Sequence, residues 1–138
     1  MKHIRFMPWL MIVLLFGCAG GSAPNILEVK QSGIKKIEIN DSALDKQVTF
    51  GEVTLRTLAQ GVEAQVMIRN LSSRDVHFEY RFVWYDAQGV EISSMTAWIP
   101  ATLNGGLSTG VLRSTAPTAA AVDFKLMIRA PRPLTDMS

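Results

Sequence analysis

The residue whose type and position point most clearly to chemistry is Cys18, the single cysteine of the 138-residue chain. It follows an apolar run, Met7 to Phe16, and one glycine, Gly17. A thiolate is a soft nucleophile that can be alkylated at neutral pH. With no second cysteine, a disulfide within the chain is impossible. A buried inert thiol and a covalently modified one are the two interpretations that remain.

The segment before Cys18 is typical of an export signal. Met1 to Phe6 carries Lys2 and Arg5 and no acid. The apolar run that follows is too short to span a bilayer, which needs about 20 apolar residues. The alternative of a buried core helix is disfavoured, because the run contains Pro8 and has no polar face. We therefore expect residues 1–17 to be a cleaved signal peptide.

The four residues Leu15-Phe16-Gly17-Cys18 resemble the lipobox of bacterial lipoproteins. The resemblance implies that the lipoprotein signal peptidase recognises Leu15, Phe16 and Gly17, although Phe16 is bulkier than the usual small residue. It also implies that Cys18 carries a diacylglycerol on its sulfur and an acyl chain such as palmitate on its amine. Two or more acyl chains hold a protein firmly on a membrane, whereas one binds marginally. In lipoproteins of the kind that this segment resembles, an aspartate after the cysteine retains the protein in the inner membrane, so by this resemblance Ala19 implies the outer membrane, on its periplasmic face.

Composition limits the function classes open to the mature chain. Removal of residues 1–17 leaves 121 of the 138 residues, enough for one domain with a core. Lys2 and Arg5 leave with the signal, so 12 basic residues face 12 acidic ones. The mature chain therefore lacks the basic surplus of a nucleic-acid-binding protein, and we expect no nucleic-acid partner.

The mature chain offers little further chemistry. Its single histidine, His77, and its modified cysteine cannot supply a zinc site. No serine lies in a nucleophile-elbow pattern. Gly105-Gly106 has neither the lysine nor the helix of a phosphate loop and is expected to be a turn. Four acids occupy the central strands and turns, where a solvated face is the simpler interpretation: Glu79, Asp86, Glu91 and Asp123. We therefore expect no enzyme, no metal and no cofactor besides the covalent lipid.

Alternation with period two dominates the chain from Ile34 onward. Residues 18–33 are expected to be the lipidated end and a tether with an extended reach of about 50 Å. Residues 34–130 are expected to form an antiparallel two-sheet β-sandwich of about seven strands, with a small barrel as the alternative. Residues 131–138 are expected to be a loose tail. The runs that predict strands are IKKIEIN, VTFGEVTLRTL, VEAQVMIRN, VHFEYRFVWYD, VEISSMTAWI, LSTGVLR and VDFKLMIRA.

Glycines and turn residues separate these runs. Gly51 stands where the alternation of the second run changes phase, which predicts a β-bulge. The stretch Asp86 to Gly89 predicts a tight hairpin, with glycine in the left-handed conformation. A second reversal is expected at Asn104 to Gly106, and Ala116-Pro117 is expected to end the preceding strand.

Aromatic side chains are the most informative residues of the fourth run. Its alternation places one set inward, as core: Phe78, Tyr80, Phe82 and Trp84. Tyr85 has the opposite parity and lies outward with Arg81. Trp98, before Ile99-Pro100, is expected near a strand end. Because aromatic and arginine side chains often anchor interfaces, Tyr85, Arg81 and Trp98 form the candidate interaction surface.

Three segments resemble the YcfL-like family of bacterial lipoproteins, whose domain has no assigned function. They are YRFVWYDAQGVEI at 80–92, WIP at 98–100 and STAPTAAAVDFKLMIR at 114–129. The resemblance covers about residues 33–129 and implies an immunoglobulin-like sandwich in the cell envelope. Members of the family are often encoded near a lipoprotein that activates a peptidoglycan synthase. The family has no established catalytic residues, so the resemblance assigns none to this chain.

These observations favour a non-enzymatic interaction or accessory module, lipid-anchored in the cell envelope and contacting another envelope protein. The alternative is a module that binds peptidoglycan or another glycan through the outward aromatic residues. A third hypothesis, an enzyme or small-ligand carrier, requires a deep internal pocket with polar groups.

Overall fold

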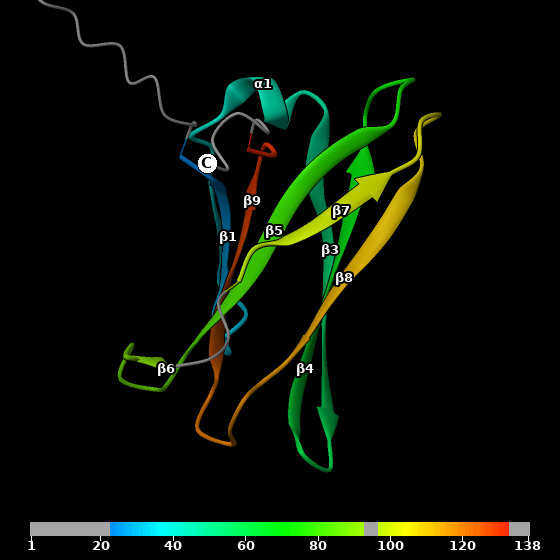
Figure 1. Ribbon diagram of the computed structural model, residues 1–138. Coiled ribbons are helices and arrows are strands. Elements are labelled where there is room, and N and C mark those ends of the chain that lie inside the picture. The colour runs from blue at the N-terminus through cyan, green and yellow to red at the C-terminus, as the bar shows by residue number, and fades with distance from the viewer. Residues whose placement is uncertain (1–22, 93–96, 133–138) are drawn as a thin grey trace, which may run out of the picture.

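The computed structural model describes residues 23–92 and 97–132, which form nine strands and one short helix in two packed layers (Figure 1). The elements are β1 (Asn25–Val29), β2 (Lys35–Glu38), α1 (Ser42–Asp45), β3 (Val48–Leu58), β4 (Gly61–Asn70), β5 (Val76–Tyr85), β6 (Glu91–Ile92), β7 (Ile99–Leu103), β8 (Thr109–Thr115) and β9 (Asp123–Arg129). Among these residues, no helix is long and apolar enough to cross a membrane.

The two layers are antiparallel sheets of unequal width. The first has the order β2-β1-β9-β5, and β6 and β7 both pair with the far edge of β5. The second has the order β3-β4-β8. No strand of the described residues belongs to both sheets, so the predicted sandwich is confirmed and the barrel alternative is not. Nine strands replace the expected seven, because β1 went unpredicted and the run VEISSMTAWI contains β6 and ends on the first residue of a further strand, β7.

The expectation of a tether through Gly33 is wrong. Strand β1 begins at Asn25 and pairs with β2 on one side and with β9 on the other. Asn25, Leu27 and Val29 are buried, while Ile26 and Glu28 between them are half-buried. The residues NILEV are therefore a central strand of the sheet, and the sandwich extends to the N-terminal side of residue 34.

The core lies between the sheets and is built from the inward positions of the strands. The largest fully buried apolar side chains are Trp84, Phe78, Phe124, Leu27, Ile68, Leu126 and Val66. Phe124 contacts two aromatic rings of β5, with centroids 5.3 Å from Trp84 and 5.7 Å from Phe82. Tyr80 is only half-buried but packs against the same core. The inward set predicted for β5 is thus confirmed.

The β-bulge and the hairpin turn predicted at two glycines are both present. The β3–β4 register shifts between Phe50 and Val53, which confirms the bulge at Gly51. Gly89 closes the β5–β6 hairpin at φ 80°, and the Asp86 carboxylate accepts hydrogen bonds from two backbone N–H groups of the turn. Helix α1 was not predicted, because four residues are too few to display a helical period; Asp41 caps it by accepting from Leu44 N.

Candidate interaction surface

The outer face of the first sheet carries alternating charged and apolar side chains on its two neighbouring strands, β5 and β9. Antiparallel register places four pairs there: Glu79 with Arg129, Arg81 with Met127, Val83 with Lys125, and Tyr85 with Asp123. Val83 is only 3% exposed although it faces away from the core. Side chains around it therefore cover this part of the outer face.

Trp98 joins this face through the pairing of β7 with β5. Pro100 lies opposite Glu79, so the residue two positions before it, just ahead of β7, comes beside Arg81. The guanidinium carbon of Arg81 lies 4.7 Å from the centre of the Trp98 ring, and that of Arg129 lies 4.0 Å from it. Each contact has the geometry of a cation–π interaction. The structure thus brings together Arg81 and Trp98, two of the three predicted surface residues.

An ion pair between Arg129 and Glu79 holds the Arg129 side chain, which also lies over the Trp98 ring. The Nε of Arg129 donates to a carboxylate oxygen of Glu79 at 2.9 Å, and both side chains are largely buried. Arg81 differs, because its Nε is buried and has no hydrogen-bond partner among the described residues. We name these four residues, Glu79, Arg81, Trp98 and Arg129, the outer-face patch. It presents an indole and two guanidinium groups against one carboxylate, which suits an acidic or mixed apolar partner.

Tyr85, the third predicted residue, lies apart from the patch. It is four residues beyond Arg81 on β5, about 13 Å along the strand. Its ring is covered instead by Lys125, whose Nζ lies 5.2 Å from the ring centre. Tyr85 and Lys125 therefore form a second point on the same sheet face. Alternation along β9 places Lys125 and Arg129 outward, but it does not connect them with the site, because it carries no sign that β9 lies next to β5.

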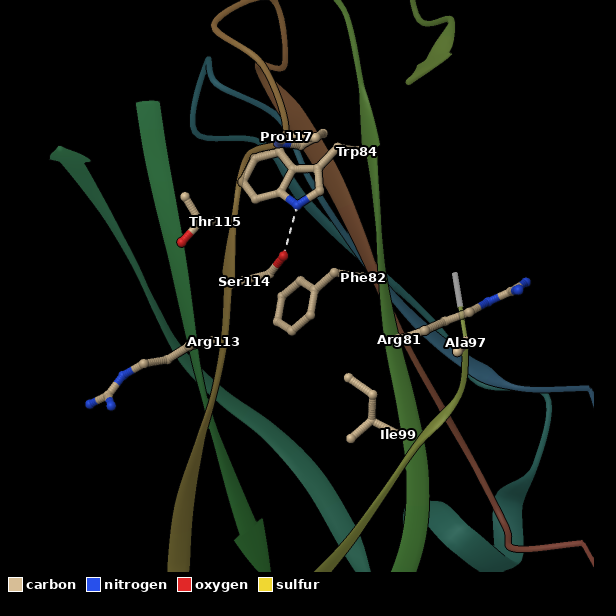
Figure 2. Close-up of a pocket in the computed structure, with 9 residues that line it drawn as sticks. All are labelled: Arg81, Phe82, Trp84, Ala97, Ile99, Arg113, Ser114, Thr115 and Pro117. Atoms are coloured by element: carbon tan, nitrogen blue, oxygen red, sulfur yellow. Dashed lines mark hydrogen bonds between the residues drawn. The ribbon is translucent and has the colours of Figure 1, made fainter. Parts of the chain in front are cut away.

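A cavity of about 180 Å³ opens between the sheets beside β5 and β8. Figure 2 shows Phe82, Ile99 and the Trp84 indole turned toward this space, while the guanidinium groups of Arg81 and Arg113 point away from it. The Trp84 Nε1 donates to Ser114 Oγ at 2.9 Å. The cavity is smaller than a typical ligand pocket of about 300–1,000 Å³. It also lacks an inward-pointing charge, so it gives little support to a small-ligand carrier.

The other described residues that the sequence singled out as possible ligands or catalytic groups do not join the outer-face patch. His77 is exposed on β5, and its Nδ1 lies 2.8 Å from Thr102 Oγ1. Within residues 23–92 and 97–132, no group of three His, Cys, Asp or Glu side chains could hold a metal ion. Gly105 and Gly106 form the turn between β7 and β8. Cys18, the lipobox Leu15-Phe16-Gly17, the signal peptide and residues 133–138 lie outside the described residues.

Residues 35–130 match the protein family described as "Protein of unknown function (DUF1425)". The chain belongs to this family. The matched range covers β2 to β9 and leaves out β1, which completes the same sheet. None of the curated proteins matches the chain.

Two solved structures resemble the fold. One is a DUF1425 family member from a Shewanella species, with 23% identity, a TM-score of 0.58, and coverage of 70% of this chain and 90% of that one. The other is a Campylobacter jejuni protein, with 20% identity, a TM-score of 0.49, and coverage of 59% and 85%. The Shewanella structure supports the sandwich fold of the DUF1425 domain, and neither likeness assigns a function.

Proposed function

We propose that the chain is a YcfL-like lipoprotein that acts as a non-enzymatic interaction module in the bacterial cell envelope. Acylated Cys18 holds it at the periplasmic face of the outer membrane, and the outer-face patch contacts another envelope protein. The lipobox resemblance supports the anchor. The partner is one that functions in the envelope, with peptidoglycan synthesis as the leading context.

One observation supports the interaction role most directly: two arginines flank the half-exposed Trp98 on the outer face of the first sheet. Tryptophan and arginine are among the side chains most enriched at the energetic centres of interfaces. The stacked guanidinium groups retain N–H groups that can donate to carboxylates of a partner.

Photo-crosslinking in the intact envelope tests this proposal. A photoreactive amino acid is placed at Tyr85, on the same sheet face as the patch, and in a second strain at Thr54, which is exposed on the second sheet. We expect one dominant protein adduct from position 85, its loss in a Cys18→Ser form, and no corresponding adduct from position 54. Trp98→Ala should weaken the adduct at least several-fold, whereas Val111→Ala, an exposed apolar change on the second sheet, should not. The same adducts from both probes, or none from Tyr85, would contradict the proposal.

A glycan-binding module is the second candidate, favoured by the two aromatic side chains on this face. Sugars stack on exposed aromatic faces, but cations already lie over the rings of Trp98 and Tyr85. A sugar ring can therefore stack only where a ring face is left open or a cation moves. Co-sedimentation with purified peptidoglycan sacculi tests this candidate. It requires binding that weakens in Tyr85→Ala, and protein that stays in the supernatant excludes it.

A further inference from the structure

Few residues separate Cys18 from the folded domain. Strand β1 begins at Asn25, so only residues 19–24 lie between the modified thiol and the first strand. Even fully extended, the chain from Cys18 to Asn25 spans at most about 25 Å. This is about half the reach expected for a tether that continues to Gly33. Wherever the lipid is inserted, the start of β1 must therefore stay close to the bilayer surface.

The start of β1 is fastened to the domain at its first residue. Asn25 is buried, and its Oδ1 accepts hydrogen bonds from the backbone N–H groups of Asn40 and Asp41, each at 2.8 Å. Its Nδ2 donates to the Asp41 carbonyl at 3.0 Å. Asn40 Nδ2 in turn donates to the carbonyl of Pro24 at 2.8 Å. Because these hydrogen bonds hold the chain from Pro24 onward against the domain, residues after Pro24 add no length to the tether.

The same end of the sandwich carries three other loops. Leu71 N donates to Gln47 O, which joins the β4–β5 loop to the chain after α1, and Asn70 N donates to Ser108 O in the β7–β8 loop. The buried Asn70 Nδ2 also donates to the carbonyl of Asn104. Figure 1 shows α1, the β4–β5 loop and the β7–β8 loop at the end where β1 starts, whereas the β5–β6 hairpin lies at the other end.

Apolar side chains project from these loops into solvent. Leu107 is 64% exposed and has a left-handed backbone, with φ 62°, in the β7–β8 loop. Leu71 and Ile39 are also exposed. A leucine in the left-handed region is unfavourable and gains nothing here from burial, so its presence suggests a contact outside the chain. The exposed Lys46 and Arg74 lie on the same loops and can face lipid phosphates.

We propose that this end of the sandwich, which we call the membrane-proximal end (Ile39, Lys46, Leu71, Arg74 and Leu107), rests on the lipid bilayer. Leu107 and Leu71 enter the headgroup region while Lys46 and Arg74 lie at phosphate level. Asp41 and Asp75 at the same end accept hydrogen bonds from backbone N–H groups of the chain itself. The inference rests on the proposed lipid anchor, because the short span from Cys18 places this end at the bilayer. It adds an orientation in which the β5–β6 hairpin points away from the membrane.

The test uses the full-length chain, expressed in its bacterial envelope, purified in acylated form and reconstituted in vesicles of phosphatidylethanolamine and phosphatidylglycerol. A diazirine amino acid is placed at position 107 or, as the matched control, at position 90. Val90 is exposed to a similar extent, 60% against 64%, but lies in the β5–β6 hairpin. We expect lipid adducts from position 107 to exceed those from position 90 at least fivefold. The excess should disappear in Cys18→Ser.

Two readouts separate the failure of this inference from the failure of the anchor. The intact mass of the purified protein reports whether Cys18 is acylated, and a chain that is not acylated overturns the anchor and the orientation together. An acylated chain with equal lipid adducts from both positions overturns the orientation alone. A protein adduct at position 107 in the intact envelope, without lipid adducts in vesicles, would assign this end to a protein partner and likewise overturn the inference.

Discussion

Trp84 and Ser114 join the two sheets through a hydrogen bond, with the indole Nε1 donating to the serine Oγ at 2.9 Å. Trp84 is fully buried on β5, and Ser114 lies on β8 at the edge of the second sheet. This bond fixes the spacing of the layers at the cavity between them. A buried indole N–H without an acceptor is costly, which leads to a first prediction.

Ser114→Ala should lower the free energy of unfolding by about 1–2 kcal/mol, because the Trp84 N–H loses its acceptor. Urea unfolding followed by tryptophan fluorescence measures the change. Thr115→Ala is the control, since Thr115 is exposed on the same strand and should change stability by less than about 0.5 kcal/mol. Equal effects of the two substitutions would show that the hydrogen bond contributes nothing specific.

Asn70→Asp should destabilise the fold by about 3 kcal/mol at neutral pH. The fully buried Asn70 donates through Nδ2 to the carbonyls of Arg74, Leu103 and Asn104, and a carboxylate there would repel all three oxygens. Burial among carbonyls should raise the pKa of the new carboxyl above its unfolded value of about 3.9. The loss relative to the native chain should therefore be smallest below that pH and grow as the pH rises.

The control for this change is Asn104→Asp, which alters an exposed side chain at one of the same loops. It should change stability little at any pH. Thermal unfolding at pH 4 and pH 7 compares the two variants. A destabilisation by Asn70→Asp that does not depend on pH would contradict the assigned cause.

Gly105→Ala should destabilise the domain by about 1–3 kcal/mol through overpacking. A Cβ at this position would overlap the backbone carbonyl of Ser73, so the β7–β8 and β4–β5 loops would have to separate. Gly106→Ala is the neighbouring control, with no atom near its Cβ but a positive φ of 82°. Its cost is the left-handed backbone alone, about 1 kcal/mol. Chemical denaturation ranks the two, and the opposite order would refute the close packing of these loops.

A double-mutant cycle on Trp98 and Arg129 should give a coupling energy of about 0.5–1 kcal/mol, the size of a partly exposed cation–π contact. The unpaired Glu79 left by Arg129→Ala is common to both arms of the cycle and cancels. The control cycle pairs Trp98 with Lys125, which lies over Tyr85 instead, and should be additive within about 0.5 kcal/mol. Unfolding free energies of the single and double alanine variants supply both values.

Leu107→Asn should raise the free energy of unfolding by about 0.5–1 kcal/mol, because asparagine adopts the left-handed conformation with less strain than leucine. The same change should weaken the binding of the membrane-proximal end to lipid vesicles. A variant that is more stable but binds lipid less well would show that Leu107 serves binding rather than folding. Asn in place of Val90, which does not have a positive φ, provides the comparison.

The strands with long alternation were predictable from sequence, but their neighbours were not. The ten-residue alternation of β5 separates Phe82 and Trp84 from Arg81 and Tyr85, and the structure keeps that division. Strand β1 has only five residues and follows a run of small ones, so its period is too short to distinguish from a tether. Contacts between Trp98 and Arg129 depend on β7 and β9 flanking β5. Local periodicity carries no information on that strand order.

The attachment of β1 has a mechanical consequence. With the proposed lipid anchor, a pull on the lipid would enter the domain at Asn25 and run along β1, which is paired with β9 over five residue pairs and with β2 over four. A partner bound to the outer-face patch holds β5 and β9 in place. Asn25 lies opposite Ile128, the neighbour of the patch residue Arg129, so the two points of attachment would lie at the same end of the β1–β9 ladder. Force between the proposed anchor and a bound partner would then pass through neighbouring residues of the sheet, and the β5–β6 hairpin at the other end of the sandwich would carry little of it.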